Sequence, residues 1–183
     1  AGYYRGSSIL ISGTAGTGKT TLAAQFVNAT CGRGERCLYF GFEESLSQIT
    51  RNMRSVGIDL DAWVQADLLQ YHGTRPTAYG LEMHLVQMHR LIEHFQPSVV
   101  VIDPVTSFLN SGTPTEVKSM LTRFIDSLKS QQITAFMTTL TFDVEHLEQT
   151  DVHVSSLIDT WLVLRDMESG GERNRGLMVM KSR

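Results

Sequence analysis

The sequence predicts an α/β domain with a mostly parallel β-sheet flanked by helices on both faces. Short, continuously apolar segments alternate with longer segments in which apolar residues recur at helical spacing. A strand that is apolar along its whole length is typical of a parallel sheet covered on both sides. Toward the C-terminus, two more apolar segments flank a turn at residues 168–171, which indicates an antiparallel strand pair at one edge.

The elements are expected where the period of the apolar pattern changes. In chain order they are a strand at 8–12, a helix at 19–31, a strand at 36–42, a helix at 45–56, a strand at 68–71, a helix at 80–95, a strand at 99–102, a helix over 117–128, and strands at 133–139, 160–164 and 177–180. The sequence contains neither an internal repeat nor a low-complexity linker.

Individual residues justify some of these elements. Ser45 is the expected N-cap of its helix, because its side chain can accept a backbone N–H of the first turn. His84, His89 and His94 recur every fifth residue, which spreads them around their helix, so we expect surface histidines and not a metal cluster. Trp161 is expected to anchor the core of an edge strand.

Length and composition exclude several classes of protein. The 183 residues suffice for one sizeable core, and no apolar run of about 18 residues exists that could cross a membrane. The two cysteines, Cys31 and Cys37, are too few for a disulfide framework or a zinc site, which fits a reducing cytoplasm. A net charge of −3, with basic and acidic residues well mixed, gives no electrostatic footprint for a polyanion such as DNA.

The strongest motif is Gly-Thr-Ala-Gly-Thr-Gly-Lys-Thr at residues 13–20, which satisfies G-x-x-x-x-G-K-[ST] between a predicted strand and a predicted helix. Its glycines let the backbone wrap with N–H groups aimed inward, and the helix N-terminus attracts an anion. Lys19 supplies a cation for the terminal phosphates, and the Thr20 hydroxyl is placed to bind Mg²⁺. A chance glycine-rich turn would lack the flanking strand and helix. We therefore expect a bound triphosphate, with contacts from Thr14, Ala15, Gly16, Thr17, Gly18, Lys19, Thr20 and Thr21.

A second motif, Val-Val-Val-Ile-Asp at residues 99–103, complements the phosphate loop. The strand ends in Asp103, which is positioned to hold the water shell of Mg²⁺ opposite Thr20. An Asp after a strand is also a common cap or turn residue. Beside a full phosphate loop, the metal role is favoured.

Glu43 and Glu44 form a pair of carboxylates at the end of the strand at 36–42. Ligands of an open α/β sheet bind beyond the carboxyl ends of its strands, and hydrolysis needs a group that orients or deprotonates water. Because adjacent strand residues point in different directions, we expect one carboxylate, for which we favour Glu43, to face the attacking water or Mg²⁺. Glu43, Glu44 and Lys19 are thus the candidate catalytic residues. The alternative is that both glutamates only favour the N-terminus of the next helix.

Together these segments resemble the KaiC family, which comprises circadian-clock ATPases and autokinases of the RecA/DnaB-like superfamily. The resemblance rests on the phosphate loop, Phe-Glu-Glu-Ser at 42–45, Arg-Asn-Met-Arg-Ser-Val-Gly-Ile-Asp at 51–59, the Val-Ile-Asp strand and Lys-Ser-Arg at 181–183. It covers essentially the whole chain and implies a RecA-like P-loop NTPase fold. Family members carry two tandem domains, and this chain looks more like the second. We therefore expect residues 1–183 to be a single domain taken from a longer protein.

The resemblance implies Mg·ATP bound between the subunits of a six-membered ring of identical chains, slow hydrolysis, and transfer of the γ-phosphate to hydroxyls of the neighbouring subunit. By position, Ser155 and Ser156 match the family's Ser-Thr phosphoacceptor pair, and Thr150 matches a further acceptor position. Ser156 replaces a Thr, which preserves a hydroxyl, whereas Val152 replaces a Ser, which does not. A Ser pair in a polar loop is otherwise only a loop. Clock or signalling proteins are the further partners implied.

The resemblance also adds residues to the nucleotide site. Arg175, Lys181 and Arg183 match basic residues that reach the next subunit's phosphates, as an arginine finger does. The alternative for these residues is solvated charge near a chain end. Ser55 and Val56 lie where the family contacts adenine, and Val56 replaces a Trp, so a stacking partner is lost.

Two other functions remain open at this point. A RecA/RadA-like motor that binds DNA needs basic loops facing the ring axis, but residues 110–115 and 141–146 contain neither Lys nor Arg. The third possibility is a nucleotide-dependent assembly module, in which ATP holds subunits together and catalysis is incidental.

Overall fold

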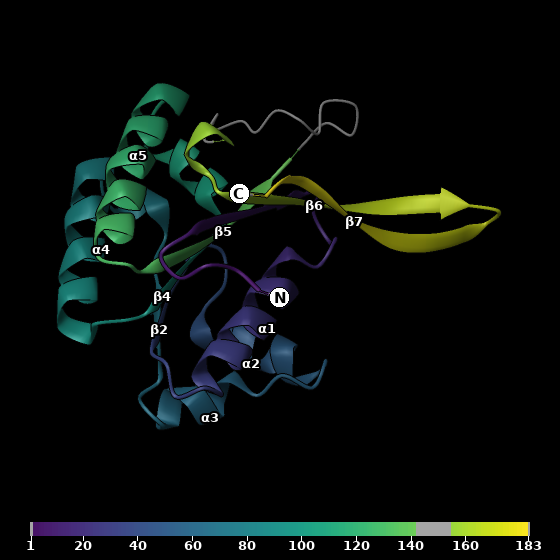
Figure 1. The fold of residues 1–183 in the computed structure, drawn as a ribbon, viewed down its shortest axis with the longest axis horizontal. Helices are drawn as coiled ribbons and strands as arrows, with labels where there is room; N and C mark the ends of the chain where they lie inside the picture. Colours follow the sequence, from purple (N-terminus) through teal and green to yellow (C-terminus); the bar gives the residue numbers. More distant parts are fainter. Residues whose placement is uncertain (1, 142–154, 183) are drawn as a thin grey trace.

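The computed structural model describes residues 2–141 and 155–182, which form a seven-stranded sheet in the order β3-β2-β4-β5-β1-β6-β7 (Figure 1). The strands are β1 (Ser8–Gly13), β2 (Cys37–Gly41), β3 (Leu69–Gly73), β4 (Val99–Asp103), β5 (Thr134–Leu140), β6 (Thr160–Ser169) and β7 (Glu172–Ser182). Neighbouring strands are parallel except β6 and β7, which are antiparallel. The predicted α/β fold, with a mostly parallel sheet and an antiparallel pair toward the C-terminus, is confirmed.

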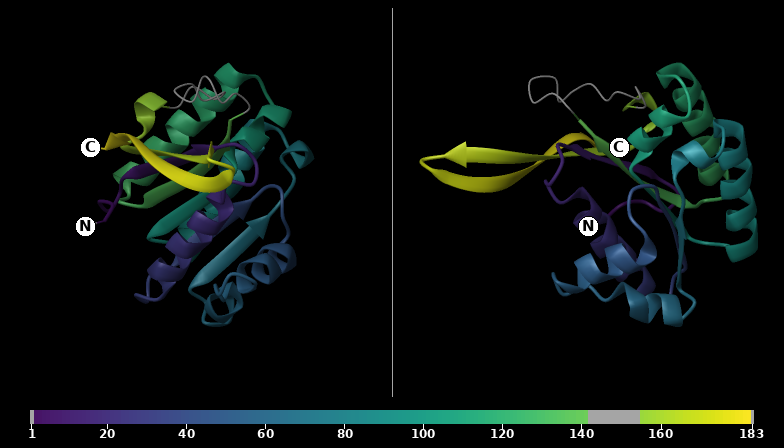
Figure 2. Two further views of the ribbon diagram at one scale, coloured as in Figure 1. Left: turned by 90° about the vertical axis from the view of Figure 1, so that its right-hand side faces the viewer. Right: turned by 180° about the vertical axis from the view of Figure 1, so that it is seen from behind.

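Helices cover both faces of this sheet, as Figures 1 and 2 show. The α-helices are α1 (Lys19–Cys31), α2 (Leu46–Arg54), α3 (Leu60–Gln65), α4 (Leu81–Phe95) and α5 (Pro114–Ser130), and the short 3-10 helices are η1 (Pro76–Ala78), η2 (Val105–Asn110) and η3 (Ser155–Leu157). The pair α4 and α5 packs on one face, and α1, α2 and α3 pack on the other. Helix α3 was not predicted, because six residues are too few to show a helical period.

The core is divided by the sheet into two apolar layers. Successive residues of a strand pack into opposite layers. Leu38 and Phe40 of β2 pack toward α4 and α5, whereas Cys37 and Tyr39 pack toward α1. Trp161 is buried in β6, where its indole Nε1 donates to the Ser12 hydroxyl at 2.8 Å. The expectation of an edge strand is wrong for Trp161, because β6 lies between β1 and β7.

The β6–β7 hairpin is much longer than predicted and extends away from the rest of the domain (Figure 2). Its ladder runs from the pair Thr160–Ser182 to the pair Ser169–Glu172 next to the turn. The outer part is polar and exposed to solvent, so its sequence has no apolar period from which a strand could be predicted. The same hairpin also leaves apolar side chains exposed, notably Leu177 (55%) and Val179 (59%).

Two predictions about helices have different outcomes. Ser45 caps α2 as predicted, in a capping box with Gln48, although the helix ends at Arg54, earlier than expected. The prediction of a surface position is wrong for His84, which is 2% exposed and places its Nε2 atom 2.7 Å from the Pro76 carbonyl oxygen. Among the described residues, no three potential metal-ligating side chains cluster. No helix in that part of the chain is long and apolar enough to span a membrane.

Candidate nucleotide-binding and catalytic site

The phosphate loop connects the end of β1 to the start of α1, as the motif predicts. Gly16 (φ 82°) and Gly18 (φ 96°) adopt left-handed backbone conformations that favour glycine. Gly18 is the N-cap of α1, and no side chain caps this end of the helix. A Cβ on Gly13 would lie 2.4 Å from the Leu164 carbonyl oxygen of β6, so only glycine fits there. The loop therefore presents backbone and a helix N-terminus to a ligand.

Lys19 is folded onto this loop and is only 7% exposed. Its ammonium donates to the carbonyl oxygens of Gly13 at 2.9 Å and Thr14 at 2.6 Å. Burial lowers the pKa of Lys19, and the nearby carboxylates of Asp103 and Glu43 partly offset that effect. The cation expected to meet the phosphates thus lies within electrostatic reach of both predicted carboxylates.

Asp103 ends β4 at the register position opposite Gly41 of β2 and is 9% exposed. The Tyr39 hydroxyl donates to its Oδ2 atom at 2.5 Å, and the Thr138 hydroxyl donates to its Oδ1 atom. These two donors fix the carboxylate, and each oxygen keeps a further lone pair to accept a hydrogen bond. Together with the half-buried Thr20 hydroxyl, the carboxylate supplies the oxygen groups that suit Mg²⁺ and its bound water.

Glu43 and Glu44 make different contacts. Desolvation and the negative charge of Asp103 raise the pKa of the Glu43 carboxyl, while interactions with Ser107 and Lys19 oppose the rise. The Glu44 carboxylate instead accepts a hydrogen bond from the Asn52 side chain of α2 at 3.4 Å. Glu43 is therefore the carboxylate that interacts with Asp103 and Lys19, and Glu44 also contacts the helix that follows.

A pocket of about 450 Å³ lies beside the phosphate loop, between α1, the end of α2 and the hairpin. Thr17, Thr21, Val56 and Arg175 are among its lining residues. The Arg175 guanidinium donates to the Gly16 carbonyl oxygen at 3.2 Å, so in this chain it contacts its own phosphate loop. Ser55 is the C-cap residue directly after α2, and its hydroxyl donates to the Asn52 carbonyl oxygen at 2.6 Å.

The remaining predicted residues lie farther along the chain. Lys181 is half-buried in β7, where it pairs with Trp161. Ser155 begins η3, and Ser156 is exposed within it, shortly before β6. Thr150, Val152 and Arg183 lie outside the described residues.

Comparison with known proteins identifies the family. A family model described as "ATPase: KaiC" matches residues 1–183. The chain belongs to the KaiC family. It is 54% identical to circadian clock protein KaiC2 of Synechocystis, over all of this chain and 32% of that protein. It is 35% identical to the circadian clock oscillator protein KaiC of Acaryochloris marina, over all of this chain and 35% of that protein. The chain thus spans about a third of the length of the curated relatives that it matches.

Several residues of this KaiC-family site were not predicted from the sequence. Tyr39 and Thr138 hold Asp103, as described above. The backbone N–H of Thr141 donates to the Gly13 carbonyl oxygen at 3.2 Å, beside Lys19. The Thr141 hydroxyl is buried and has no hydrogen-bond partner within the described part of the chain. Tyr39 and Thr138 lie inside buried strands, where a single polar residue gives no local signal of a site, and Thr141 directly follows a strand, where polar residues are also common in turns.

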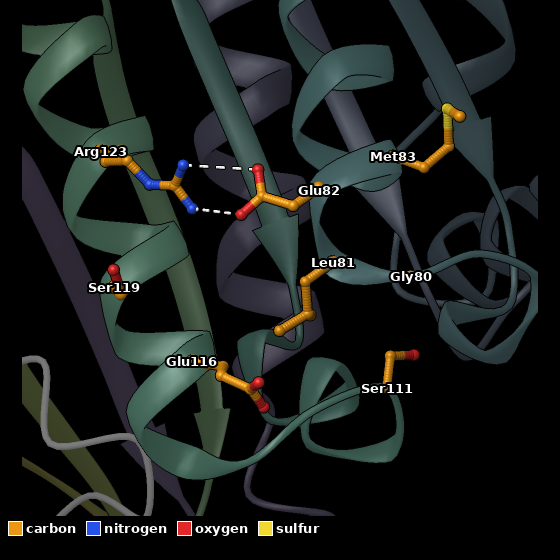
Figure 3. A pocket seen from close by; sticks show the side chains of 8 residues that line it. All are labelled: Gly80, Leu81, Glu82, Met83, Ser111, Glu116, Ser119 and Arg123. Carbon is orange, nitrogen blue, oxygen red and sulfur yellow. Dashed lines mark hydrogen bonds and ion pairs between the residues drawn. The ribbon is translucent and has the colours of Figure 1, made fainter.

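A second depression, of about 340 Å³, lies between the N-terminal parts of α4 and α5 of this KaiC-family chain (Figure 3). Both terminal nitrogens of the Arg123 guanidinium group point at the Glu82 carboxylate in Figure 3, and the shorter hydrogen bond is 2.6 Å long. The Glu116 carboxylate accepts from the Thr113 backbone N–H at 2.8 Å. The charged groups of this depression are thus already paired with each other or with backbone groups of the chain.

Proposed function

We propose that this KaiC-family domain binds Mg·ATP at the phosphate loop and hydrolyses it. The observation that carries the proposal is the convergence of Lys19, Asp103 and Glu43 at the carboxyl ends of three strands or their connections. All three groups influence one another electrostatically. A cation, a buried carboxylate and a partly desolvated carboxyl are the side chains that phosphoryl transfer requires.

Each residue has a specific role in the proposal. Lys19 would leave the carbonyl oxygens that it now contacts and bind the terminal phosphates, while Thr20 and Asp103 would hold Mg²⁺ and its water. Bound Mg²⁺ would neutralise part of the negative charge of the phosphates. Glu43 would accept the proton of the attacking water as the bond from the γ-phosphorus to the leaving oxygen of ADP breaks. The raised pKa of Glu43 makes it a stronger base than an ordinary glutamate.

The pocket beside the loop is the proposed adenine site. Its walls include the aliphatic side chains of Val56, Ile58 and Leu177. Val56 is 57% exposed, so a base placed over it would cover apolar surface. Among the described residues, no aromatic side chain lines this pocket, so the proposed contact with the base is aliphatic.

We also propose that the domain assembles with copies of itself, as a hexameric ring with ATP at the subunit interfaces. Support comes from the projecting hairpin, where Met167, Leu177, Met178 and Val179 are all between 38% and 59% exposed. Apolar side chains exposed on both faces of a thin hairpin favour burial against another chain. Lys181 and Arg183 would then reach the neighbour's phosphates, and Arg175 would contribute from its own chain.

Autophosphorylation of Ser155 and Ser156, and a part in a circadian clock or in signalling, complete the proposal. Their support is the motif resemblance and the names of the relatives, which are circadian clock proteins. The exposed position of Ser156 is compatible with approach by a neighbour's site. A DNA motor is disfavoured, because residues 110–115 contain neither Lys nor Arg.

Incubation with γ-labelled ATP tests the proposal. An autokinase retains label on the protein, and the label disappears in the Ser155→Ala/Ser156→Ala variant. Release of free phosphate alone indicates an ATPase without kinase activity, and turnover stimulated by DNA indicates a motor. Nucleotide-dependent assembly without labelled protein and without phosphate release would indicate an assembly module and not an enzyme.

A further inference from the structure

Tyr71 of β3 fills the space over the carboxyl ends of two neighbouring strands. Its hydroxyl donates to the backbone carbonyl oxygen of Glu44 at 2.6 Å. A Cβ on Gly41 would lie 1.8 Å from the Tyr71 hydroxyl oxygen, and a Cβ on Gly73 would lie 3.1 Å from the ring carbon Cε1. A side chain at Gly41 would therefore displace the ring, and one at Gly73 would crowd it.

The two glycines face each other, because Gly41 of β2 pairs with Gly73 of β3. Neither has a φ in the left-handed region, so the backbone conformation does not require glycine at either position. The close approach of the phenol ring requires glycine at position 41 and leaves only tight space at position 73. The ring of Tyr71 thus lies in a slot formed by Gly41 and Gly73, directly below the segment that carries Glu43 and Glu44.

We propose that Tyr71 is a positioning residue that holds the tip of β2 so that Glu43 is directed toward Lys19 and Asp103. The inference rests on the proposed hydrolysis of ATP and deepens it. The bond to the Glu44 carbonyl fixes the backbone where the chain leaves β2 and before α2 begins at Leu46. A fixed backbone restricts the positions open to the Glu43 carboxylate, and catalysis depends steeply on such placement.

The same side chain is coupled to Asp103. The rings of Tyr71 and Tyr39 stack with centroids 5.2 Å apart and planes inclined by 26°. The Tyr39 hydroxyl in turn donates to the Asp103 carboxylate at 2.5 Å. Burial raises the pKa of both tyrosines, so both stay protonated and donate at neutral pH. One stacked pair therefore supports both the glutamate tip and the proposed metal carboxylate.

The test is the Tyr71→Phe variant, which keeps the ring in its slot and removes only the hydroxyl. ATP turnover with Mg²⁺, ATP affinity and amide hydrogen exchange are measured on the full chain. We expect kcat to fall about five- to tenfold while the Kd for ATP stays within about twofold. Exchange should become faster by about the same factor at residues 42–46 and stay unchanged elsewhere. Tyr4→Phe, at a residue that is 77% exposed, is the matched control and should behave as wild type.

The outcomes separate this inference from the proposed function. Wild-type kcat and wild-type exchange at residues 42–46 in Tyr71→Phe would overturn the positioning role, as would faster exchange spread over the whole chain. If the wild-type chain does not hydrolyse ATP, the proposed function fails. Amide hydrogen exchange alone then tests the positioning role, and faster exchange in Tyr71→Phe that is confined to residues 42–46 supports it. Gly73→Ala, which crowds the ring but keeps the hydroxyl, should show a smaller change of the same kind, and wild-type behaviour there counts against the slot.

Discussion

Removing the Tyr39 hydroxyl should destabilise the domain, because it leaves a buried carboxylate with one donor in place of two. Tyr39 is 1% exposed and Asp103 is 9% exposed, and the hydroxyl and Oδ2 are 2.5 Å apart. Phenylalanine fills the same volume, so Tyr39→Phe creates no cavity and isolates the hydrogen bond. A hydrogen bond to a charged group contributes about 1.5–3 kcal/mol. We therefore expect the free energy of unfolding to fall by about 2 kcal/mol.

Urea unfolding followed by circular dichroism measures this change at constant pH and without nucleotide. For a chain of this size, the expected loss corresponds to a decrease in Tm of about 4–8 °C. Tyr4→Phe serves as the control and should change the free energy by less than about 0.5 kcal/mol. A Tyr39→Phe variant as stable as the control, with an unchanged denaturant slope, would show that this contact does not hold Asp103.

Three further predictions concern Glu43, the proposed catalytic carboxylate, and the hairpin. In Glu43→Gln the side chain cannot accept a proton, so the rate of phosphate release should fall by at least about 100-fold. Calorimetry should show little change in ATP affinity. Full activity of this variant would rule out Glu43 as the base. Because the folded state raises the Glu43 pKa, the native chain binds more protons than the unfolded chain as the pH rises above 4.5. The free energy of unfolding of the wild type, measured in urea, should therefore fall relative to that of Glu43→Gln as the pH rises from about 4.5 through the raised pKa of Glu43. Parallel pH profiles of the two proteins would contradict the raised pKa. Met178→Ser/Val179→Ser changes two exposed hairpin residues outside the proposed adenine pocket. It should abolish nucleotide-dependent assembly in light scattering and leave the monomer folded, and unchanged assembly would exclude the hairpin as the interface.

The sequence predicted the elements whose local pattern reports burial. Strands β2 and β4 are buried along their whole length, and such runs can be recognised without tertiary information. The outer part of the β6–β7 hairpin lacks such an apolar run because both its faces are exposed to solvent. The spacing of His84 to the other histidines does not report its burial, whereas its spacing to Met88 does. Since Met88 is four residues away on the buried face, the same period places His84 inward.

The candidate site was predictable where its residues are contiguous. The phosphate loop is a single segment, so its strand, glycines and lysine were found together. The groups around Asp103 come from three strands: Tyr39 lies in β2, Asp103 in β4 and Thr138 in β5. Only the strand order β2-β4-β5 makes them neighbours, and no local spacing encodes that order. The slot around Tyr71 depends in the same way on the pairing of β2 with β3.

Every role proposed for Lys19, Asp103 and Glu43 requires that the phosphate loop bind a nucleotide. Isothermal titration of the folded chain with ATP in the presence of Mg²⁺ tests this claim, with Lys19→Ala as the comparison. We expect saturable uptake of close to one ATP per chain, and markedly weaker uptake by Lys19→Ala. A folded wild-type chain that takes up no ATP, or a Lys19→Ala variant that binds it equally well, would contradict the account.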